Sequence, residues 1–188
     1  MGKADVTKER ILAAALAEFS AYGVAGARVD RIARTAGCNK NLIYVYFESK
    51  ETLFTTVLDK HLSRVYSDLT LTPDDLPAYA ARVFDFALEH RDLLRLIAWS
   101  NLEEQAAEPA ERARVHGSKV TELAEAQAAG ELNPVLPPDF LLTAVMTLAT
   151  AWSAANPFGP SLDPEATKNS TELRHHLTEA VRLLTKPA

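Results

Sequence analysis

The stretch from residue 28 to residue 50 constrains the fold of this chain most, because it holds two short helical patterns joined by a tight turn. In the first pattern Val29, Ile32 and Ala33 recur at helical spacing, so they are expected to share one buried face. Gly37 is predicted to end this helix, since glycine adopts the left-handed backbone conformation that closes a helix without steric cost. Two short helices around such a turn are typical of a helix-turn-helix.

The second short helix is expected to carry a polar exposed side. Asn39 is predicted to cap this helix by accepting a hydrogen bond from a free backbone amide, and Ile43 and Phe47 are expected to anchor it to the core. The other side combines amides suited to base edges, a cation suited to phosphate and a tyrosine able to reach the backbone. These residues are Asn39, Lys40, Asn41, Tyr44 and Val45. A helix-turn-helix places such a face in the DNA major groove.

A third helix is predicted to start directly after this segment. Ser49 is expected to cap it, and Glu51 is favourable in its first turn. Lys50 lies where free amides and the helix dipole already attract an anion, so we expect it to hold a DNA phosphate. In isolation Lys50 also fits a solvated lysine beside Glu51, and its position within the pattern favours the phosphate contact.

Charge is divided unevenly along the chain. The net charge of -5 at first argues against nucleic acid, but residues 1–50 carry +3 and residues 51–188 carry -8. A basic N-terminal segment on an acidic body fits a protein that presents one end to DNA.

The composition favours an all-α fold in a soluble, cytoplasmic protein. Hydrophobic residues make up 47% of the chain, with only 7 glycines, and no strand-like alternation appears. Cys38 is the only cysteine, which excludes a disulfide within the chain and suggests a reducing compartment. No apolar run is long enough to span a bilayer, and the charged N-terminus does not resemble a signal peptide.

About nine helices are expected from periodicity and breaker residues. The first is predicted from a Thr7 cap to Gly23, and residues 103–110 and 156–164 are predicted to be connectors. After the two short helices, further helices are expected near residues 50–69, 76–90, 93–102, 113–129, 140–155 and 165–185. We divide the chain into a three-helix DNA-binding domain, 1–48, and a helical effector-binding and dimerisation domain, 49–188.

Residues 11 to about 58 closely resemble the DNA-binding domain of the tetracycline-repressor (TetR/AcrR) family of bacterial transcription regulators. The resemblance covers about the first third of the chain, and its combination of residues is specific although no single piece is. The matching residues are Ile11, Ala14, Phe19, Gly23, Val29, Ile32, Ala33, Ala36, Gly37, Lys40, Ile43, Tyr44, Phe47, Ser49, Lys50, Glu51 and Leu53.

Two positions depart from the family pattern. The family commonly has Ser or Thr at the start of the second helix, where this chain has Ala27 and Arg28, so one cap and one phosphate contact are missing. Leu42 stands where a small polar residue is common. It either packs on a thymine methyl group or extends the core.

The resemblance implies a regulator, most often a repressor, that binds a palindromic operator as a homodimer and is released by a small effector. Asn39, Lys40 and Asn41 are expected to read bases. The expected DNA-contacting set also includes Arg28, Leu42, Tyr44, Val45, Tyr46 and Lys50, with Arg28, Tyr44, Tyr46 and Lys50 mainly on phosphates.

The last two helices are expected to pair with their copies in a four-helix bundle, as in that family. Burial within one subunit is the alternative for the apolar 140–155 helix. A cavity for an apolar or aromatic effector is expected in the second domain, although each of its residues also fits plain core. The candidate residues are Phe84, Phe86, Leu96, Trp99, Met146 and Trp152.

Neither a catalytic site, a metal site nor a cofactor is expected. On a helix the adjacent His175 and His176 point about 100° apart, and Asp59 and His61 about 200° apart, so neither pair converges on an ion. The alternatives are a helical-bundle enzyme and a ligand-binding or interaction protein without sequence-specific DNA binding. The latter leaves the basic N-terminal segment and the polar face at residues 39–41 unexplained.

Overall fold

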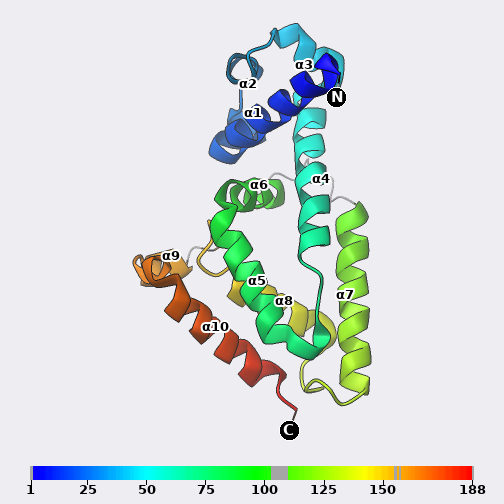
Figure 1. Cartoon of the computed structure of the whole chain (residues 1–188), viewed down its shortest axis with the longest axis vertical. Helices are drawn as coiled ribbons and strands as arrows, with labels where there is room; N and C mark the ends of the chain where they lie inside the picture. The colour runs from blue at the N-terminus through cyan, green and yellow to red at the C-terminus, as the bar shows by residue number, and fades with distance from the viewer. Residues whose placement is uncertain (1, 103–109, 155, 157, 188) are drawn as a thin grey trace. The chain divides into compact units, whose positions relative to one another are not determined.

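The computed structural model describes residues 2–102, 110–154, 156 and 158–187. Regular structure in these residues is helical, with no strand (Figure 1). The chain divides into two compact units. Unit 1 comprises Met1–Arg64 and Asp92–Ala107, and unit 2 comprises Val65–Arg91 and Glu108–Ala188. Among the described helices none is long and apolar enough to cross a membrane.

Unit 1 contains the two short predicted helices and the elements that support them. Its helices are α1 (Lys3–Gly26), α2 (Val29–Ala36), α3 (Lys40–Phe47), most of α4 (Lys50–Asp68) and α6 (Arg91–Leu102). Apolar side chains from all five helices are buried. Ser20 ties α6 to α1, because its carbonyl accepts hydrogen bonds from Arg95 Nε at 3.1 Å and Trp99 Nε1 at 3.2 Å.

Helix α1 begins earlier and ends later than its sequence pattern predicted. It begins at Lys3 rather than near Thr7. At its start the Gly2 amide donates to Asp5 Oδ2 at 2.9 Å. Gly23 interrupts the helical backbone with φ 66° and ψ -178°, which agrees with the predicted break. A short helical segment nevertheless follows, so α1 runs to Gly26.

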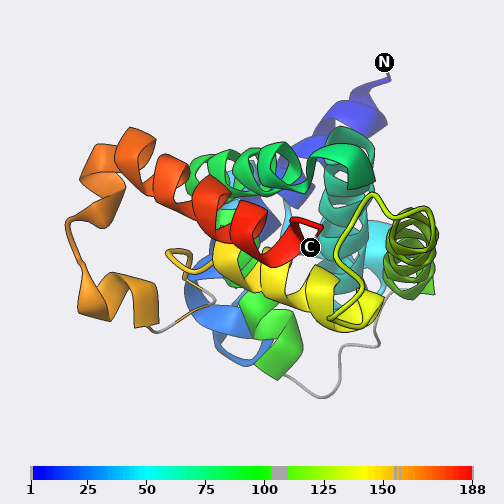
Figure 2. The same ribbon diagram turned by 90° about the horizontal axis from the view of Figure 1, so that it is seen from below.

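Unit 2 is organised around α5 (Leu76–Glu89), which packs against both α8 (Pro138–Ala149) and α10 (Ser170–Thr185) (Figures 1 and 2). Helix α7 (Ala110–Ala128) also packs against α8. The remaining elements are the 3-10 turns η1 (Pro73–Asp75) and η2 (Ala166–Asn169) and the short helix α9 (Phe158–Leu162). A continuous apolar core links α5, α7, α8 and α10.

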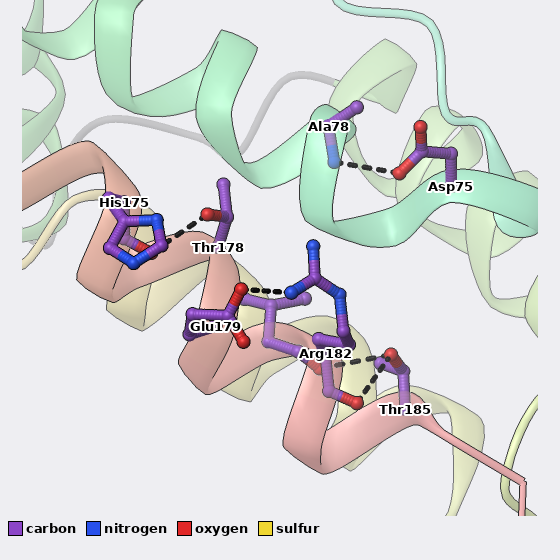
Figure 3. Close-up of polar contacts among 8 residues, drawn as sticks. Asp75, Ala78, His175, Thr178, Glu179, Arg182 and Thr185 are labelled. Atoms are coloured by element: carbon purple, nitrogen blue, oxygen red, sulfur yellow. Dashed lines mark hydrogen bonds and ion pairs between the residues drawn. The ribbon is translucent and has the colours of Figure 1, made fainter. Parts of the chain in front are cut away.

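The ends of α5 and α10 are closed by polar side chains (Figure 3). Asp75 caps α5, since its Oδ1 accepts a hydrogen bond from the Ala78 amide at 3.0 Å. At the end of α10, the Thr185 hydroxyl donates to the Val181 carbonyl at 2.9 Å. Arg182 and Glu179 form an ion pair on the same helix. The Asp75 contact satisfies a backbone amide that the start of a helix leaves without a partner.

The predicted helix boundaries disagree with the structure after residue 149. Helix α8 ends at Ala149, where the Thr150 amide and hydroxyl both bond to the Met146 carbonyl. The predicted connector 156–164 contains α9, which raises the α-helices in the described residues to ten, and the last helix begins at Ser170. The predicted end at Ala155 lies outside the described residues, as does the predicted connector 103–110 except for Ala110.

Gly159 explains how α9 fits against the end of α8. A Cβ atom at Gly159 would lie 2.2 Å from the Ala151 carbonyl oxygen, a distance that real Cβ atoms do not show. Only glycine permits this approach of two backbones. The single glycine in a segment rich in turn residues therefore marks a packing contact rather than a loop.

A buried polar group interrupts the core of unit 2. Lys119 Nζ donates to the Tyr79 hydroxyl at 2.8 Å and to the Leu69 carbonyl at 3.2 Å. The Tyr79 hydroxyl in turn donates to Met146 Sδ at 3.6 Å. Burial lowers the pKa of Lys119, because the charged form loses solvation, and the nearby Glu122 opposes this effect.

Tyr79 gives the stability of unit 2 an alkaline limit. Burial raises the pKa of Tyr79 to about 12 from 10.0, because the phenolate is poorly solvated there. A pKa raised by folding stabilises the folded state below pH 10, and this contribution of roughly 2–3 kcal/mol is lost between pH 10 and 12. Below pH 10.5 the lowered pKa of Lys119 acts in the other direction, so that stability rises with pH.

Urea unfolding of wild type and Tyr79→Phe from pH 8 to pH 12 tests this expectation. Wild type is expected to lose stability above pH 10 more steeply than Tyr79→Phe. Tyr22→Phe changes an exposed tyrosine and is the matched control. Equal slopes for wild type and Tyr79→Phe would contradict the prediction.

Candidate DNA-binding surface

The turn between α2 and α3 forms as the sequence predicted. Gly37 adopts the left-handed conformation, with φ 62° and ψ 43°, and its amide donates to the Arg34 carbonyl at 3.2 Å. The Cys38 amide donates to the Ala33 carbonyl at 3.0 Å. Asn39 Oδ1 accepts a hydrogen bond from the Asn41 amide at 2.8 Å, which caps α3. These local bonds fix where α3 begins relative to α2.

Arg10 braces the same turn from α1. Its Nη2 donates to the carbonyls of Ala36 and Gly37, in the second case at 3.1 Å. The end of α2 leaves these carbonyls without partners within the helix, and a cation is favourable there. A Cβ atom at Gly37 would lie 2.4 Å from Arg10 Nη2, so the glycine also makes room for the guanidinium.

Helix α3 is attached to unit 1 by one side and leaves the other side open. Ile43 and Phe47 are buried, as their four-residue spacing predicted. Leu42 and Tyr46 are partly covered, and the Tyr46 ring meets that of Phe47 edge to face at 6.3 Å between centroids. The residues exposed to solvent are Asn39, Lys40, Asn41, Tyr44 and Val45.

Lys40 is held by a carboxylate on the neighbouring helix. Its Nζ donates to Asp30 Oδ2 at 3.0 Å, and this hydrogen bond raises the pKa of Lys40. Both side chains are solvent exposed. A DNA acceptor that binds Lys40 therefore has to replace or share this contact, which the sequence did not predict.

Lys50 lies at the start of α4, beside the start of α2. Ser49 caps α4, since its Oγ accepts a hydrogen bond from the Thr52 amide at 3.0 Å, and Lys50 Nζ donates to the Ala27 carbonyl at 3.4 Å. An open hollow of about 430 Å³ lies at this place. Its wall includes Arg28, Asp30, Lys40, Tyr44 and Lys50. Four predicted DNA-contacting residues are thus neighbours in space, namely Arg28, Lys40, Tyr44 and Lys50.

Two residues that shape this surface, Glu18 and Arg31, were not predicted from the sequence. Glu18 is buried on α1, and its carboxylate accepts hydrogen bonds from the Arg28 amide at 2.9 Å and Arg31 Nε at 2.7 Å. The signal was present, because Glu18 shares a helical face with the apolar Ile11 and Ala15. A carboxylate at such a position requires a buried partner.

The six predicted effector-contacting residues are distributed over both units. Phe84 is buried in unit 2, and Phe86, Met146 and Trp152 are partly buried against the same core. The Trp152 Nε1–H group is buried and has no hydrogen-bond partner in the described part of the chain. Leu96 and Trp99 belong to unit 1, where Leu96 is buried and Trp99 bonds to Ser20.

Comparison with known proteins agrees with this geometry. Residues 11–57 match the family model of bacterial regulatory proteins of the tetR family. Residues 75–182 match the model of the tetracyclin repressor-like C-terminal domain. The first match contains the whole helix-turn-helix, and the second covers more than half of the chain.

Individual relatives match across both units. The HTH-type transcriptional repressor SCO4008 of Streptomyces coelicolor is 37% identical over 156 residues, which are 81% of each chain. The HTH-type transcriptional repressor NicS of Pseudomonas putida is 30% identical over 144 residues, 71% of this chain and 63% of that protein. The crystal structure of the putative transcriptional regulator SCO4942 from Streptomyces coelicolor is 34% identical, with a TM-score of 0.86 over 97% of this chain and 99% of that one. The chain therefore belongs to the TetR family of transcriptional regulators.

Proposed function

We propose that this regulator is a repressor that binds a palindromic operator as a homodimer and releases it when a small effector binds. Its similarity to two proteins named HTH-type transcriptional repressors supports repression as the outcome. In this proposal residues 1–48 and the adjoining Lys50 contact DNA, and the rest of residues 49–188 bind the effector and form the dimer. The effector can change DNA binding only if it binds the two conformations of the regulator with different affinities.

The observation that carries the proposal is the exposed side of α3. Three neighbouring polar residues, Asn39, Lys40 and Asn41, stand at the N-terminal end of this helix, the end that contacts base edges in a helix-turn-helix. Asparagine amides pair with adenine edges in the major groove. Arg28 and Lys50 flank the adjoining hollow, where they are suited to phosphates.

Four of the candidate effector residues support an apolar or aromatic effector in unit 2. Phe84, Phe86, Met146 and Trp152 all pack in or against its core. The Trp152 Nε1–H group, which has no partner among the described residues, offers a hydrogen-bond donor, so we propose that the effector carries one acceptor. Leu96 and Trp99 remain sequence predictions for this role.

Selection from fragments of the organism's own genome tests the proposed function. Purified protein, shown to be folded and dimeric, is incubated with the fragments at moderate salt, and the retained DNA is sequenced. Enrichment of one palindrome with half-sites about one helical turn apart is the expected result. Retention of nothing, or of DNA without sequence preference, would contradict the proposal and favour a protein that does not read DNA.

The proposed dimer uses α8 and α10, which expose apolar side chains. Phe140 on α8 and Leu183 on α10 are both exposed in the single chain. Exposed apolar residues on two helices that pack against each other are suited to a four-helix contact with a second copy. A two-fold axis through this contact generates the symmetry that a palindrome requires.

Leu183→Asp is expected to convert the dimer to monomer at micromolar concentration, because it places two carboxylates in a contact that excludes water. Sedimentation velocity measures the effect. Leu162→Asp on α9 is the matched control, since Leu162 is 82% exposed and Leu183 79% exposed, and only Leu183 lies on α8 or α10. A dimer that survives Leu183→Asp and dissociates with Leu162→Asp would place the interface elsewhere.

A further inference from the structure

Helix α2 begins without a cap from its own segment. Its N-cap residue, Arg28, makes no side-chain capping bond, and the preceding Ala27 has no polar side chain. In a capping box the third helical residue is a Glu or Gln that accepts a hydrogen bond from the N-cap amide. Here the third helical residue is Arg31, which has no acceptor atom.

Glu18 supplies the missing acceptor from α1. Its Oε1 accepts the Arg28 amide at 2.9 Å, and the same oxygen lies 2.6 Å from Arg31 Nη2 and 2.7 Å from Arg31 Nε. Arg31 therefore stands at the position where a capping box has its carboxylate, and it binds the carboxylate of Glu18 from α1. Glu18 is only 8% exposed, so water does not compete strongly for these bonds.

Arg31 extends this contact across the whole turn between α1 and α2. Its Nη2 also donates to the Gly26 carbonyl at 2.9 Å, at the end of α1. The guanidinium stacks over the Tyr22 ring at 4.3 Å from the centroid. Burial raises the pKa of Glu18, but hydrogen bonds from Arg31 and the Arg28 amide outweigh this effect, and the net pKa is lowered. Glu18 is thus ionised at neutral pH.

We infer that Glu18, held by Arg31, is a positioning residue for operator binding that fixes the backbone of Arg28 at the start of α2. Arg28 is exposed and lines the hollow beside α3 and α4, so its side chain is available to a phosphate. Glu18 is buried and carries the charge that DNA repels, and it acts through Arg28 rather than on DNA. This inference rests on the proposed function, because it requires an operator.

A double-mutant cycle on the selected palindrome tests the inference. Glu18→Gln is expected to weaken operator binding about tenfold and to reduce the magnitude of the salt slope by about 1.8, which corresponds to one phosphate contact in each of two subunits. Arg28→Ala is expected to produce a similar loss. In the Arg28→Ala background, Glu18→Gln is expected to cause no further change, because the contact that it positions is already absent.

Glu9→Gln is the matched control, since Glu9 lies on the same helix, forms an exposed ion pair with Lys60 and loses the same charge. Each variant is compared at a temperature at which circular dichroism shows that it is folded. Equal effects of Glu9→Gln and Glu18→Gln, or an unchanged effect of Glu18→Gln in the Arg28→Ala background, would overturn the inference alone. Absence of selective binding by the wild type would overturn the proposed function and the inference with it.

Discussion

Asn41→Ala is expected to weaken binding to the selected palindrome by roughly 2–6 kcal/mol, or about 30-fold to more than 10,000-fold. A well-placed contact to a base edge contributes about 1–3 kcal/mol, and a homodimer presents each contact twice. Asn41 is exposed in the first turn of α3, next to the Asn39 cap. An amide side chain there is suited to hydrogen bonding with adenine in the major groove.

The kind of loss distinguishes a base contact from a phosphate contact. The affinities of Asn41→Ala and of Lys50→Ala are measured in competition with palindromes that carry a substitution at each base pair in turn. Asn41→Ala is expected to lose its preference at one position in each half-site while the salt slope stays nearly unchanged. Lys50→Ala is expected to weaken binding to all sequences alike and to reduce the salt slope.

Asn169→Ala is the control for this comparison, because it removes an exposed asparagine from unit 2. It is expected to leave both affinity and preference unchanged. A uniform loss of affinity for Asn41→Ala, with a reduced salt slope, would assign Asn41 to the DNA backbone instead of a base.

The parts of this surface that could be predicted from the sequence depend on residues close to one another in the chain. Gly37, Asn39 and Ser49 act on backbone groups within a few residues of themselves, so their roles follow from local conformational preference. The anchors Ile43 and Phe47 follow from helical periodicity in the same way. Each of these predictions agrees with the structure.

Contacts between distant residues could not be predicted in this way. From the sequence, Ala27 and Arg28 indicated that α2 lacks a cap. The structure shows that the Arg28 amide is accepted by Glu18, which lies ten residues earlier on another helix. Arg10 on α1 bonds to the carbonyls of Ala36 and Gly37, which lie 26 and 27 residues later in the chain. Periodicity assigns a residue to a face, but it does not identify the partner from another helix that meets this face.

The second half of the chain shows a different limit. Gly159 stands in a segment rich in turn residues, and the sequence alone does not reveal that the Ala151 carbonyl occupies the space of its missing side chain. Aromatic residues at helical spacing likewise fit both a core and a ligand cavity, so Phe84 and Trp152 could be assigned to a region only. Only a three-dimensional structure reveals that the Nε1–H of Trp152 has no partner within the described ranges.

Phe54→Ala is expected to destabilise unit 1 by about 3–5 kcal/mol, through the loss of a buried aromatic side chain and the cavity left behind. Phe54 on α4 is 1% exposed and meets Phe19 on α1 edge to face, with ring centroids 5.2 Å apart and an angle of 87°. This geometry adds to the stabilisation from burial. Because domains are stable by only about 5–15 kcal/mol, operator binding is expected to fail at a much lower temperature than in the wild type.

The two tryptophans report on the units separately, because Trp99 lies in unit 1 and Trp152 in unit 2. In a Trp152→Phe background, Phe54→Ala is expected to lower the melting temperature reported by Trp99 by more than about 10 °C. In a Trp99→Phe background, the midpoint reported by Trp152 is expected to move less. Phe84→Ala, which removes a phenylalanine of equal exposure from unit 2, is expected to reverse this order. If each substitution shifts both midpoints equally, the two units unfold as one cooperative body, and the stability of either unit cannot be changed without changing that of the other.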